Sequence, residues 1–482
     1  MKSLIIFYFS LFTYLSSNAT TWLVGSTSTY TFCSQVASLV QDGDTILIEA
    51  GVYINDPQVK WSKNNLYIAG IGGRPRLEAG DIIANDLSNG KGIFVIGGNN
   101  VHVHNIEFAN AKVKDHNGAG IRQEGANLWV TNCFFDGNEM GILAGNISNC
   151  KTTVEYCEFV HGGSVANPGY QHNIYINHID TLVFRYNYTH NAIAEGHELK
   201  SRATYNIILY NRIANEDSED SRTIDLPNGG TSVIVGNIIE QGPNSANSNL
   251  VGFGLEGLTN PAPHALYCTN NTFVNKKSTG SFIQVRNGTD TLYVKNNIFA
   301  GAKTGGLLIG TPTVLDSSNN EINNAVDAIG FEDADNHDYH LSSSSIVMDR
   351  GISLNKMVNG YSLQPSIEYV DTCNFISRAS NGTIDIGAFE YGMPSATQEA
   401  GEINFLVYPN PANDNFWIEY NAPVSQRPLL IVSNVNGEVV LNQRLDTGKM
   451  NLNTTTWGSG IYFLRVQNGI QSQMRKLVVN KI

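Results

Sequence analysis

Three short segments of this chain carry side chains that could do acid–base chemistry, and they recur at one spacing. The segments begin at His172, His197 and Arg222, and they read HNIYIN, HELKSR and RTIDLP. Each interval, 172 to 197 and 197 to 222, is 25 residues. In strand-rich sequence a period of this size is typical of a solenoid that adds one coil per repeat.

Aligning the three segments predicts which side chains lie side by side on adjacent coils. Ile174, Leu199 and Ile224 fall above one another, and side chains alternate between the two faces of a strand. The flanking positions are therefore expected to point outward in two ladders, which are Tyr175, Lys200 and Asp225 in one and Asn173, Glu198 and Thr223 in the other.

Lys200 is the centre of the predicted reactive patch. Adjacent coils are about 4.8 Å apart, so we expect Lys200 within reach of both Tyr175 and Asp225. With Arg202 nearby, these residues form a coupled set of titrating groups. Asp225 could instead simply pair with Lys200 at the surface, and His172 and His197 could be stacked scaffold residues. The convergence of so many reactive types favours a functional site.

Composition and charge restrict the class of protein. The chain has 482 residues, 15% charged residues, 46 glycines and a net charge of −13. This is the composition of a folded, turn-rich β protein rather than a disordered one. The acidic balance argues against nucleic acid or an anionic membrane as a general partner, although a local basic groove could still bind an acidic substrate.

Residues 1–19 have the pattern of a secretory signal peptide. Lys2 precedes an apolar core over 4–15, and Ser17 to Ala19 offers a small-residue cleavage site. The apolar run is too short for a membrane anchor, and no later transmembrane segment is found. Export would permit disulfides among the six cysteines. Cys133 and Cys157, however, are 24 residues apart and could equally be stacked buried residues.

A recurrent phrase, Asn followed closely by Ile or Phe, runs through the middle of the chain. It appears at Asn105, Asn132, Asn211, Asn237, Asn271 and Asn297. Asn suits tight turns and can also form hydrogen-bonded ladders. The pattern resembles the right-handed parallel β-helix, a pectate-lyase-like solenoid, over residues 20–392. We therefore expect an all-β protein and a monomer.

The C-terminal part differs from the rest. Residues 393–403 (MPSATQEAGE and Ile403) form a polar linker, and turn phrases such as YPNPA and NVNG punctuate alternating strands over 404–482. These strands predict a small antiparallel β-sandwich. The phrases resemble the C-terminal sorting domain of the type IX secretion system. The resemblance implies handling by that machinery in a Bacteroidetes-type bacterium, and a secreted or outer-membrane cell-surface location. A carbohydrate-binding sandwich is the alternative reading.

A secreted β-helix offers a long open groove, which suits a polymer, and many such proteins resemble polysaccharide lyases. β-Elimination from a uronate needs a neutralised carboxylate, a base and an acid. The candidate catalytic residues are Tyr175, His197, Lys200, Arg202 and Asp225. The candidate residues that bind an acidic polysaccharide are Arg122, His172, Asn173, Arg222 and Asn228.

The run from Glu195 to Ser201 (EGHELKS) is similar to the chondroitinase B-like lyases of family six. That resemblance implies Lys200 as the base and Glu195 and Glu198 as Ca²⁺ ligands. The family places an arginine on the next coil where this chain has Asp225, so Arg222 or Arg202 would have to take its role.

Three other functions fit the same residue pattern. A glycoside hydrolase would use a carboxylate pair, with Glu198 and Asp225 as the candidates. A C5-epimerase would share the proton abstraction but not the cleavage. A non-catalytic surface protein would bind glycans without reaction. The sequence leaves open which polysaccharide is bound and whether cleavage is endo or exo.

Overall fold

The structure is a computed structural model, and it describes residues 19–80, 90–379, 382–392, 404–421, 428–434, 439–445, 448–468 and 471–481. The predicted linker and all but the last residue of the predicted signal peptide lie outside these ranges. Across the described residues the chain is almost wholly β, with one short α-helix, α1 (Cys33–Ala37), near its start and two 3-10 helices further along. No helix in these ranges is long and apolar enough to cross a membrane.

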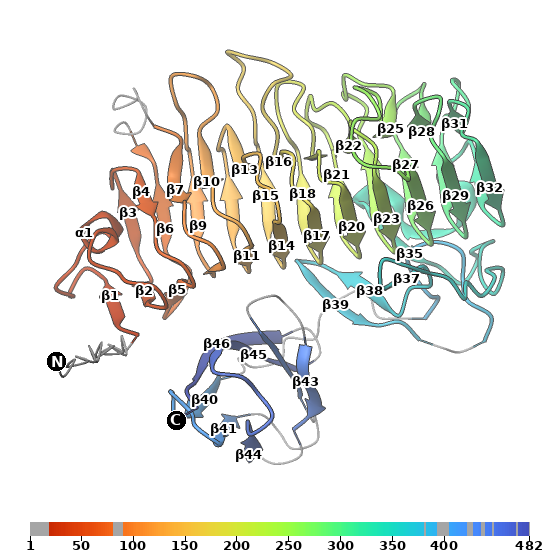
Figure 1. Ribbon diagram of the computed structural model, residues 1–482. Coiled ribbons are helices and arrows are strands. Elements are labelled where there is room, and N and C mark those ends of the chain that lie inside the picture. Colours follow the sequence, from red (N-terminus) through yellow and green to blue (C-terminus); the bar gives the residue numbers. More distant parts are fainter. Residues whose placement is uncertain are drawn as a thin grey trace, which may run out of the picture.

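Three parallel sheets wind together into a solenoid (Figure 1). The 12-stranded sheet consists of β1 (Thr21–Val24), β2 (Thr45–Glu49), β5 (Tyr67–Ile71), β8 (Val101–His104), β11 (Leu128–Thr131), β14 (Lys151–Glu155), β17 (Thr181–Arg185), β20 (Tyr205–Leu209), β23 (Thr231–Val235), β26 (Ala265–Thr269), β29 (Thr291–Lys295) and β32 (Val314–Ser318). The 10-stranded sheet consists of β4 (Val59–Trp61), β7 (Gly92–Ile96), β10 (Ala119–Gln123), β13 (Met140–Ala144), β16 (Ile174–Ile176), β19 (Leu199–Ser201), β22 (Ile224–Leu226), β25 (Asn249–Phe253), β28 (Ser281–Val285) and β31 (Leu308–Ile309). The 11-stranded sheet consists of β3 (Val52–Ile54), β6 (Arg76–Glu78), β9 (Glu107–Ala109), β12 (Phe134–Asp136), β15 (Glu158–Val160), β18 (Tyr188–His190), β21 (Arg212–Ala214), β24 (Ile238–Gln241), β27 (Thr272–Asn275), β30 (Ile298–Gly301) and β33 (Glu321–Asn323). The predicted parallel β-helix is confirmed.

The core runs along the axis of the solenoid as columns of like side chains. Phe135 and Phe159 lie one coil apart with ring centroids 4.5 Å apart and an interplanar angle of 1°. Ile174, Leu199 and Ile224 form another such column and are fully buried. Each coil therefore packs its apolar residues on those of the next coil, which is how a solenoid builds one continuous core.

A ladder of asparagines follows one corner of the solenoid, and all of its members except the last, Asn320, are buried. It contains Asn187, Asn211, Asn237, Asn271, Asn297 and Asn320. At each step the side-chain oxygen of one asparagine accepts the backbone N–H and the amide N–H of the asparagine one coil earlier, as Asn237 does from Asn211 at 2.9 Å for both contacts. The predicted stacking of the repeated Asn phrase is confirmed for this part of the chain.

All six cysteines are free. The backbone N–H of Cys133 points at the Cys157 sulfur, 3.4 Å away, and both residues are buried. The reading as stacked buried residues on adjacent coils is therefore the correct one.

After the last coil the chain folds back along the solenoid. This segment contains two 3-10 helices, η1 (Asp327–Ile329) and η2 (Ala334–Asn336). It also contains the strands β34 (Phe331–Asp333), β35 (Asp338–Leu341), β36 (Met357–Val358), β37 (Tyr361–Ser362), β38 (Ile367–Val370) and β39 (Asn374–Ser377). The strands form three antiparallel pairs. The Tyr210 hydroxyl accepts the Ser366 backbone N–H at 3.2 Å, which ties the segment to the 12-stranded sheet.

The C-terminal module, residues 404–481, has two antiparallel sheets around its own core. One sheet holds β40 (Asn404–Tyr408), β41 (Asn415–Asn421) and β44 (Lys449–Asn453), and the other holds β42 (Leu429–Asn434), β43 (Val439–Arg444), β45 (Gly460–Asn468) and β46 (Gln471–Val479). Phe416, Val432, Leu464 and Leu477 are fully buried between them. The predicted antiparallel strands are thus confirmed, and Figure 1 shows this module beside the solenoid.

The asparagine ladder gives a prediction about stability. Replacing Asn237 by alanine would leave the Ile208 carbonyl and the Asn211 N–H groups without their partners inside the protein. Buried polar groups without partners cost about 1–3 kcal/mol each, so we expect a loss of about 3–5 kcal/mol in the free energy of unfolding. Chemical denaturation monitored by circular dichroism would measure it. Asn324→Ala, at an exposed position, is the control and should change stability little.

Candidate functional site

The predicted ladder forms on the 10-stranded sheet. Tyr175 on β16 pairs in register with Lys200 on β19, and Lys200 pairs with Asp225 on β22. We call these three residues and Arg202 the ledge. The buried column of Ile174, Leu199 and Ile224 sets the register, because a slip of one residue would move those apolar side chains out of the core.

Lys200 is held between two carboxylates. Its ammonium nitrogen lies 3.1 Å from Asp225 Oδ2 and 2.8 Å from Glu256 Oε1. The lysine is 8% exposed and Asp225 is 2% exposed, whereas the Glu256 side chain is 47% exposed. Glu256 therefore forms the outer cover of the lysine, and the sequence analysis did not identify this residue.

Arg202 connects the other members of the ledge. Its Nε donates to the Tyr175 hydroxyl at 2.8 Å, Nη1 donates to Asn228 Oδ1 at 2.6 Å, and Nη2 donates to Glu256 Oε2 at 2.6 Å. Burial acts to lower the pKa of Arg202, but the hydrogen bonds to Tyr175 and Glu256 outweigh burial and raise it. Burial raises the pKa of Glu256, but Lys200 and Arg202 outweigh that effect and lower it. Glu256 is thus an anion that bridges two cations.

The two predicted histidines stack as neutral rings. Their centroids are 4.7 Å apart, with an interplanar angle of 18°. The His197 backbone N–H donates to His172 Nδ1, and the Arg222 backbone N–H donates to His197 Nδ1, both at 3.0 Å. Each Nδ1 is therefore an acceptor, and the ring proton lies on Nε2. Burial lowers the pKa of both rings well below the ordinary value.

Asp225 joins His197, Lys200 and Arg222. His197 Nε2 lies 3.6 Å from Asp225 Oδ2, and Arg222 Nη1 lies 3.4 Å from Asp225 Oδ1. Because His197 is neutral and carries its proton on Nε2, it supports the carboxylate without adding a charge. This arrangement makes His197 a group that positions Asp225.

Polar side chains on later coils continue the site beyond Asp225. Arg222 Nε donates to Asn249 Oδ1 at 2.9 Å, and Asn249 Nδ2 donates to Gln284 Oε1 at 2.5 Å. Gly252 pairs with Asp225, and a Cβ there would come within 3.0 Å of the Arg222 side chain. Because Gly252 has no side chain, it provides the space that the Arg222 side chain occupies. Asn249 follows Arg222 by 27 residues, so extending the repeat by one coil would have identified it.

The second predicted outward ladder is wrong. Asn173, Glu198 and Thr223 are 1%, 0% and 0% exposed. Each precedes its strand by one residue, at a corner where the alternation of a strand does not apply. Glu198 accepts hydrogen bonds from Asn173 Nδ2 at 2.6 Å and from the Ala192 backbone N–H at 2.8 Å. Asn173 is therefore a scaffold residue and does not reach the ledge.

The two glutamates predicted to bind Ca²⁺ do not fit that ion together. Glu195 is exposed, whereas Glu198 is enclosed and its oxygens already accept several hydrogen bonds. Calcium takes six to eight oxygen ligands that converge on one point. In the described ranges no group of three or more His, Cys, Asp or Glu side chains is arranged to hold a metal ion.

Arg122 lies on the same column of the sheet as the ledge. It pairs with Leu143, and Leu143 pairs with Tyr175, so one apolar residue separates Arg122 from the ledge. Glu124 Oε1 is 4.0 Å from its Nε. Arg122 does not contact the ledge but continues its cationic column.

The loop that carries Glu256 is firmly anchored. The Glu256 backbone N–H donates to the Pro227 carbonyl at 3.0 Å, and Asn260 Nδ2 donates to the carbonyls of Ala203 and Gly229 at 3.1 and 2.9 Å. Gly254 and Gly257 have positive φ angles (70° and 135°), which allow the tight path. The loop therefore forms a wall of the site, and the Glu256 side chain, 47% exposed, lies between that wall and solvent.

A pair of buried carboxyl groups lies on the inner side of the site. Burial, and then the neighbouring Asp220, raises the pKa of Glu198 well above its ordinary value. Burial raises the pKa of Asp220 from 3.8 to about 7, against the opposing hydrogen bonds from Ser245 and Asn215. These groups keep a proton in the folded protein at pH values where exposed carboxyls have lost theirs.

Comparison with known proteins identifies the C-terminal module. Residues 406–480 match the family model described as the Secretion system C-terminal sorting domain. These residues are thus a type IX sorting domain, which indicates secretion to the cell surface or beyond. No curated protein matches the chain.

One solved structure similar to this chain is the pectin methylesterase from Aspergillus niger, in a penultimately deglycosylated form. The two are 10% identical, and the match covers 70% of this chain and 93% of that chain with a TM-score of 0.32. A likeness at this level carries no argument about activity.

The buried carboxyl pair predicts how stability depends on pH. Because the folded state raises the pKa of Asp220 to about 7, its contribution to stability is fully present below pH 3.8 and is lost as the pH rises through 7. We expect Asp220→Asn to remove this contribution, so that the variant gains stability relative to the wild type between pH 4 and 7. Thermal unfolding across that range would measure the difference. Asp217→Asn, at an exposed position, should show no such trend, and parallel curves for Asp220→Asn would contradict the assignment.

Proposed function

We propose that the protein is a secreted polysaccharide lyase, which cleaves an acidic, uronate-containing polysaccharide by β-elimination at the ledge. The observation that carries this proposal is that one carboxylate, that of Glu256, is bound at once by Lys200 and Arg202. The same Arg202 also binds the Tyr175 hydroxyl. A uronate carboxylate in place of Glu256 would lie beside the Arg202 guanidinium, the Lys200 nitrogen and a phenol.

β-Elimination requires stabilisation of the negative charge that develops when C5 loses its proton. Arg202 neutralises the uronate carboxylate and so stabilises that charge. Lys200 takes the C5 proton on its Nζ, in the state in which it has given up its own proton to solvent. As the C4–C5 double bond forms and the C4–O bond breaks, the Tyr175 hydroxyl donates its proton to the leaving oxygen.

Three residues position these groups rather than react. Asp225 Oδ2 lies 3.1 Å from the Lys200 nitrogen and directs it along the ledge. Asp225 is held in turn by the neutral His197 ring and by the Arg222 guanidinium. Arg222, Asn228 and Arg122 extend the ledge in both directions along the solenoid, which suits the binding of consecutive sugar units.

Glu256 has to leave its position before a substrate carboxylate can bind. Its side chain is 47% exposed, so it can turn into solvent while the loop backbone stays anchored. An incoming uronate replaces one charge-assisted interaction with an equivalent one. This exchange would favour substrates with an ionised carboxylate over neutral sugars.

One observation favours a glycoside hydrolase as the second candidate. The carboxylates of Asp225 and Glu256 both contact the Lys200 ammonium, so they lie close to each other on the ledge. Hydrolysis needs two carboxyl groups on either side of the scissile bond. Glu198, the partner expected from the sequence, accepts hydrogen bonds from Asn173 and the Ala192 backbone N–H and does not contact the ledge residues. If the protein is a hydrolase, its pair is therefore Asp225 and Glu256.

Replacement of the proposed base tests the lyase assignment. We expect Lys200→Ala to lower kcat on the cleaved uronate polymer by about 10²–10⁴-fold, because the C5 proton has no acceptor. Ultraviolet absorbance of the unsaturated product, measured over a panel of uronate polymers, follows the reaction. Lys303→Ala, away from the ledge, is the control. New reducing ends without absorbance would indicate a hydrolase, and C5 proton exchange without cleavage would indicate an epimerase. Full activity of Lys200→Ala would contradict the assignment of Lys200 as the base.

Glu256→Gln separates the two enzyme classes. In the lyase this change removes a charge that competes with the substrate, so KM should fall by about two- to fivefold, the range of an exposed ion pair. In the hydrolase the same change removes a catalytic carboxyl group, and kcat should collapse. Steady-state kinetics on the polymer that the wild type cleaves distinguishes the outcomes. Glu332→Gln, at an exposed position far along the chain, is the matched control.

A further inference from the structure

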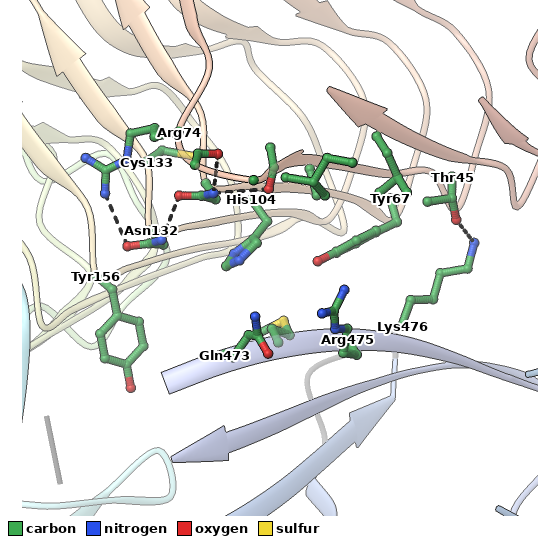
Figure 2. Close-up of a pocket in the computed structure, with 18 of the residues that line it drawn as sticks. Thr45, Tyr67, Arg74, His104, Asn132, Cys133, Tyr156, Gln473, Arg475 and Lys476 are labelled. Carbon is green, nitrogen blue, oxygen red and sulfur yellow. Dashed lines mark hydrogen bonds between the residues drawn. The ribbon is translucent and has the colours of Figure 1, made fainter. Parts of the chain in front are cut away.

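A cavity of about 870 Å³ lies between the sorting domain and the solenoid. Its volume is within the range of small-molecule sites, which span about 300–1,000 Å³. β46 of the sorting domain forms one wall, and residues of the 12-stranded sheet and its adjoining corner form the opposite wall. In Figure 2, Arg475 reaches from β46 toward Tyr67 and His104 of the solenoid. The cavity is on a different sheet from the ledge.

A specific interface holds the two walls together. Arg465 of β45 is 7% exposed, and its guanidinium donates to the Tyr156 hydroxyl and to Glu155 Oε2, both at 2.7 Å. Arg185 binds the other oxygen of Glu155 at 2.5 Å. Burial would raise the pKa of Glu155, but Arg185 and Arg465 outweigh it and lower the pKa to about 2. The ion triad is therefore charged at any ordinary pH.

Aromatic packing completes this interface. The Phe463 ring lies 4.7 Å from His102 and 5.2 Å from Trp129, in edge-to-face geometry with both. Phe463 is 5% exposed. The cavity is thus the space left beside a packed junction, and its walls have a defined separation.

Cations dominate the cavity wall. Arg74, Arg475 and Lys476 line it, and Glu158 is the one acidic residue among the described lining residues. This balance is the reverse of the whole chain, which has 43 acidic residues and 30 lysines and arginines. The charged residues of the cavity wall are thus mostly cationic, although the whole protein has a net negative charge.

None of these three cations forms an ion pair with a carboxylate of the described residues. Arg74 donates to Asn132 Oδ1 at 3.3 Å, and the Lys476 ammonium donates to the Gly43 carbonyl and the Thr45 hydroxyl at 2.6 and 2.7 Å. The Nε of Arg475 is buried and has no hydrogen-bond partner within the described part of the chain. A buried donor without a partner marks a place where a ligand atom or ion would be stabilised.

Two titrating groups beside the cavity have lowered pKa values, and burial is the largest cause for both. Burial, followed by the charges of Arg465, Arg74 and Arg475, lowers the pKa of His104 to about 3. Burial also lowers the pKa of Lys476 to about 8, although the charge of Asp44 acts to raise it. A bound anion would offset the charges of the arginines that lie around His104.

We propose that this cavity binds an anion with two or more carboxylate or phosphate groups, which bridges the sorting domain and the solenoid. Arg475 and Lys476 contact the anion from the sorting domain, and Arg74 contacts it from the solenoid. The site needs both parts of the chain, so the bound anion stabilises the docked position of the sorting domain. This inference does not depend on the proposed lyase activity, because none of its residues belongs to the ledge.

Titration calorimetry on the full chain tests the proposal with two probes that contain no uronate, citrate for a carboxylated ligand and pyrophosphate for a phosphorylated one. We expect one equivalent of at least one probe to bind, with an affinity that falls as salt rises. Arg475→Gln and Arg74→Gln should each weaken binding by about tenfold or more, as expected for loss of a charged hydrogen bond. The probe that binds more tightly identifies the source of the anionic group.

Two further variants locate the bound probe. Arg350→Gln, an exposed arginine away from the cavity, and Lys200→Ala on the ledge should both bind the probe like the wild type. Loss of binding in Lys200→Ala would place the anion on the ledge and overturn the proposal. Binding of neither probe by the wild type, or normal binding by Arg74→Gln, would also overturn it. Arg74 is exposed, so its replacement keeps the test valid if Arg475→Gln does not fold.

Discussion

The register between successive coils is the constraint on which the rest of this structure depends. Each coil repeats the apolar column of the one before, and parallel pairing then carries every flanking side chain to a fixed place. Tyr175, Lys200 and Asp225 lie side by side because Ile174, Leu199 and Ile224 stack in the core. The ledge is therefore a direct consequence of core packing.

Many buried polar groups of the solenoid form hydrogen bonds with groups on the adjacent coil. The asparagine ladder satisfies backbone and side-chain groups at one corner, and the stacked histidines do the same beside the ledge. Such networks stabilise a structure only when every member has its partner. The buried carboxyl pair of Glu198 and Asp220 follows the same principle through protonation, since burial raises the pKa of both groups.

Charge is distributed unevenly over an acidic protein. At the ledge and beside it, Lys200, Arg202 and Arg222 contact the carboxylates of Asp225 and Glu256. The cavity at the junction gathers cations that have no carboxylate partner in the described residues. The first arrangement suits exchange of an internal carboxylate for that of a substrate, and the second suits capture of a free anion. Because the rest of the protein is acidic, the ledge and the cavity are two places that would attract negatively charged ligands.

The sequence by itself determined the solenoid and the register of Tyr175, Lys200 and Asp225, because repeat spacing and strand alternation are local properties of the chain. The sorting domain was predicted from the resemblance of its turn phrases to a known family. Only the tertiary structure decided that Glu256 covers Lys200, since a loop 56 residues further along brings it there. Only the tertiary structure enclosed Glu198, where the chain turns a corner before its strand and alternation fails. The contact of Arg465 with Glu155, 310 residues apart, was likewise decided by packing between two modules. Local patterns predict which residues share a strand face, whereas loop paths, corners and docking depend on contacts between distant segments.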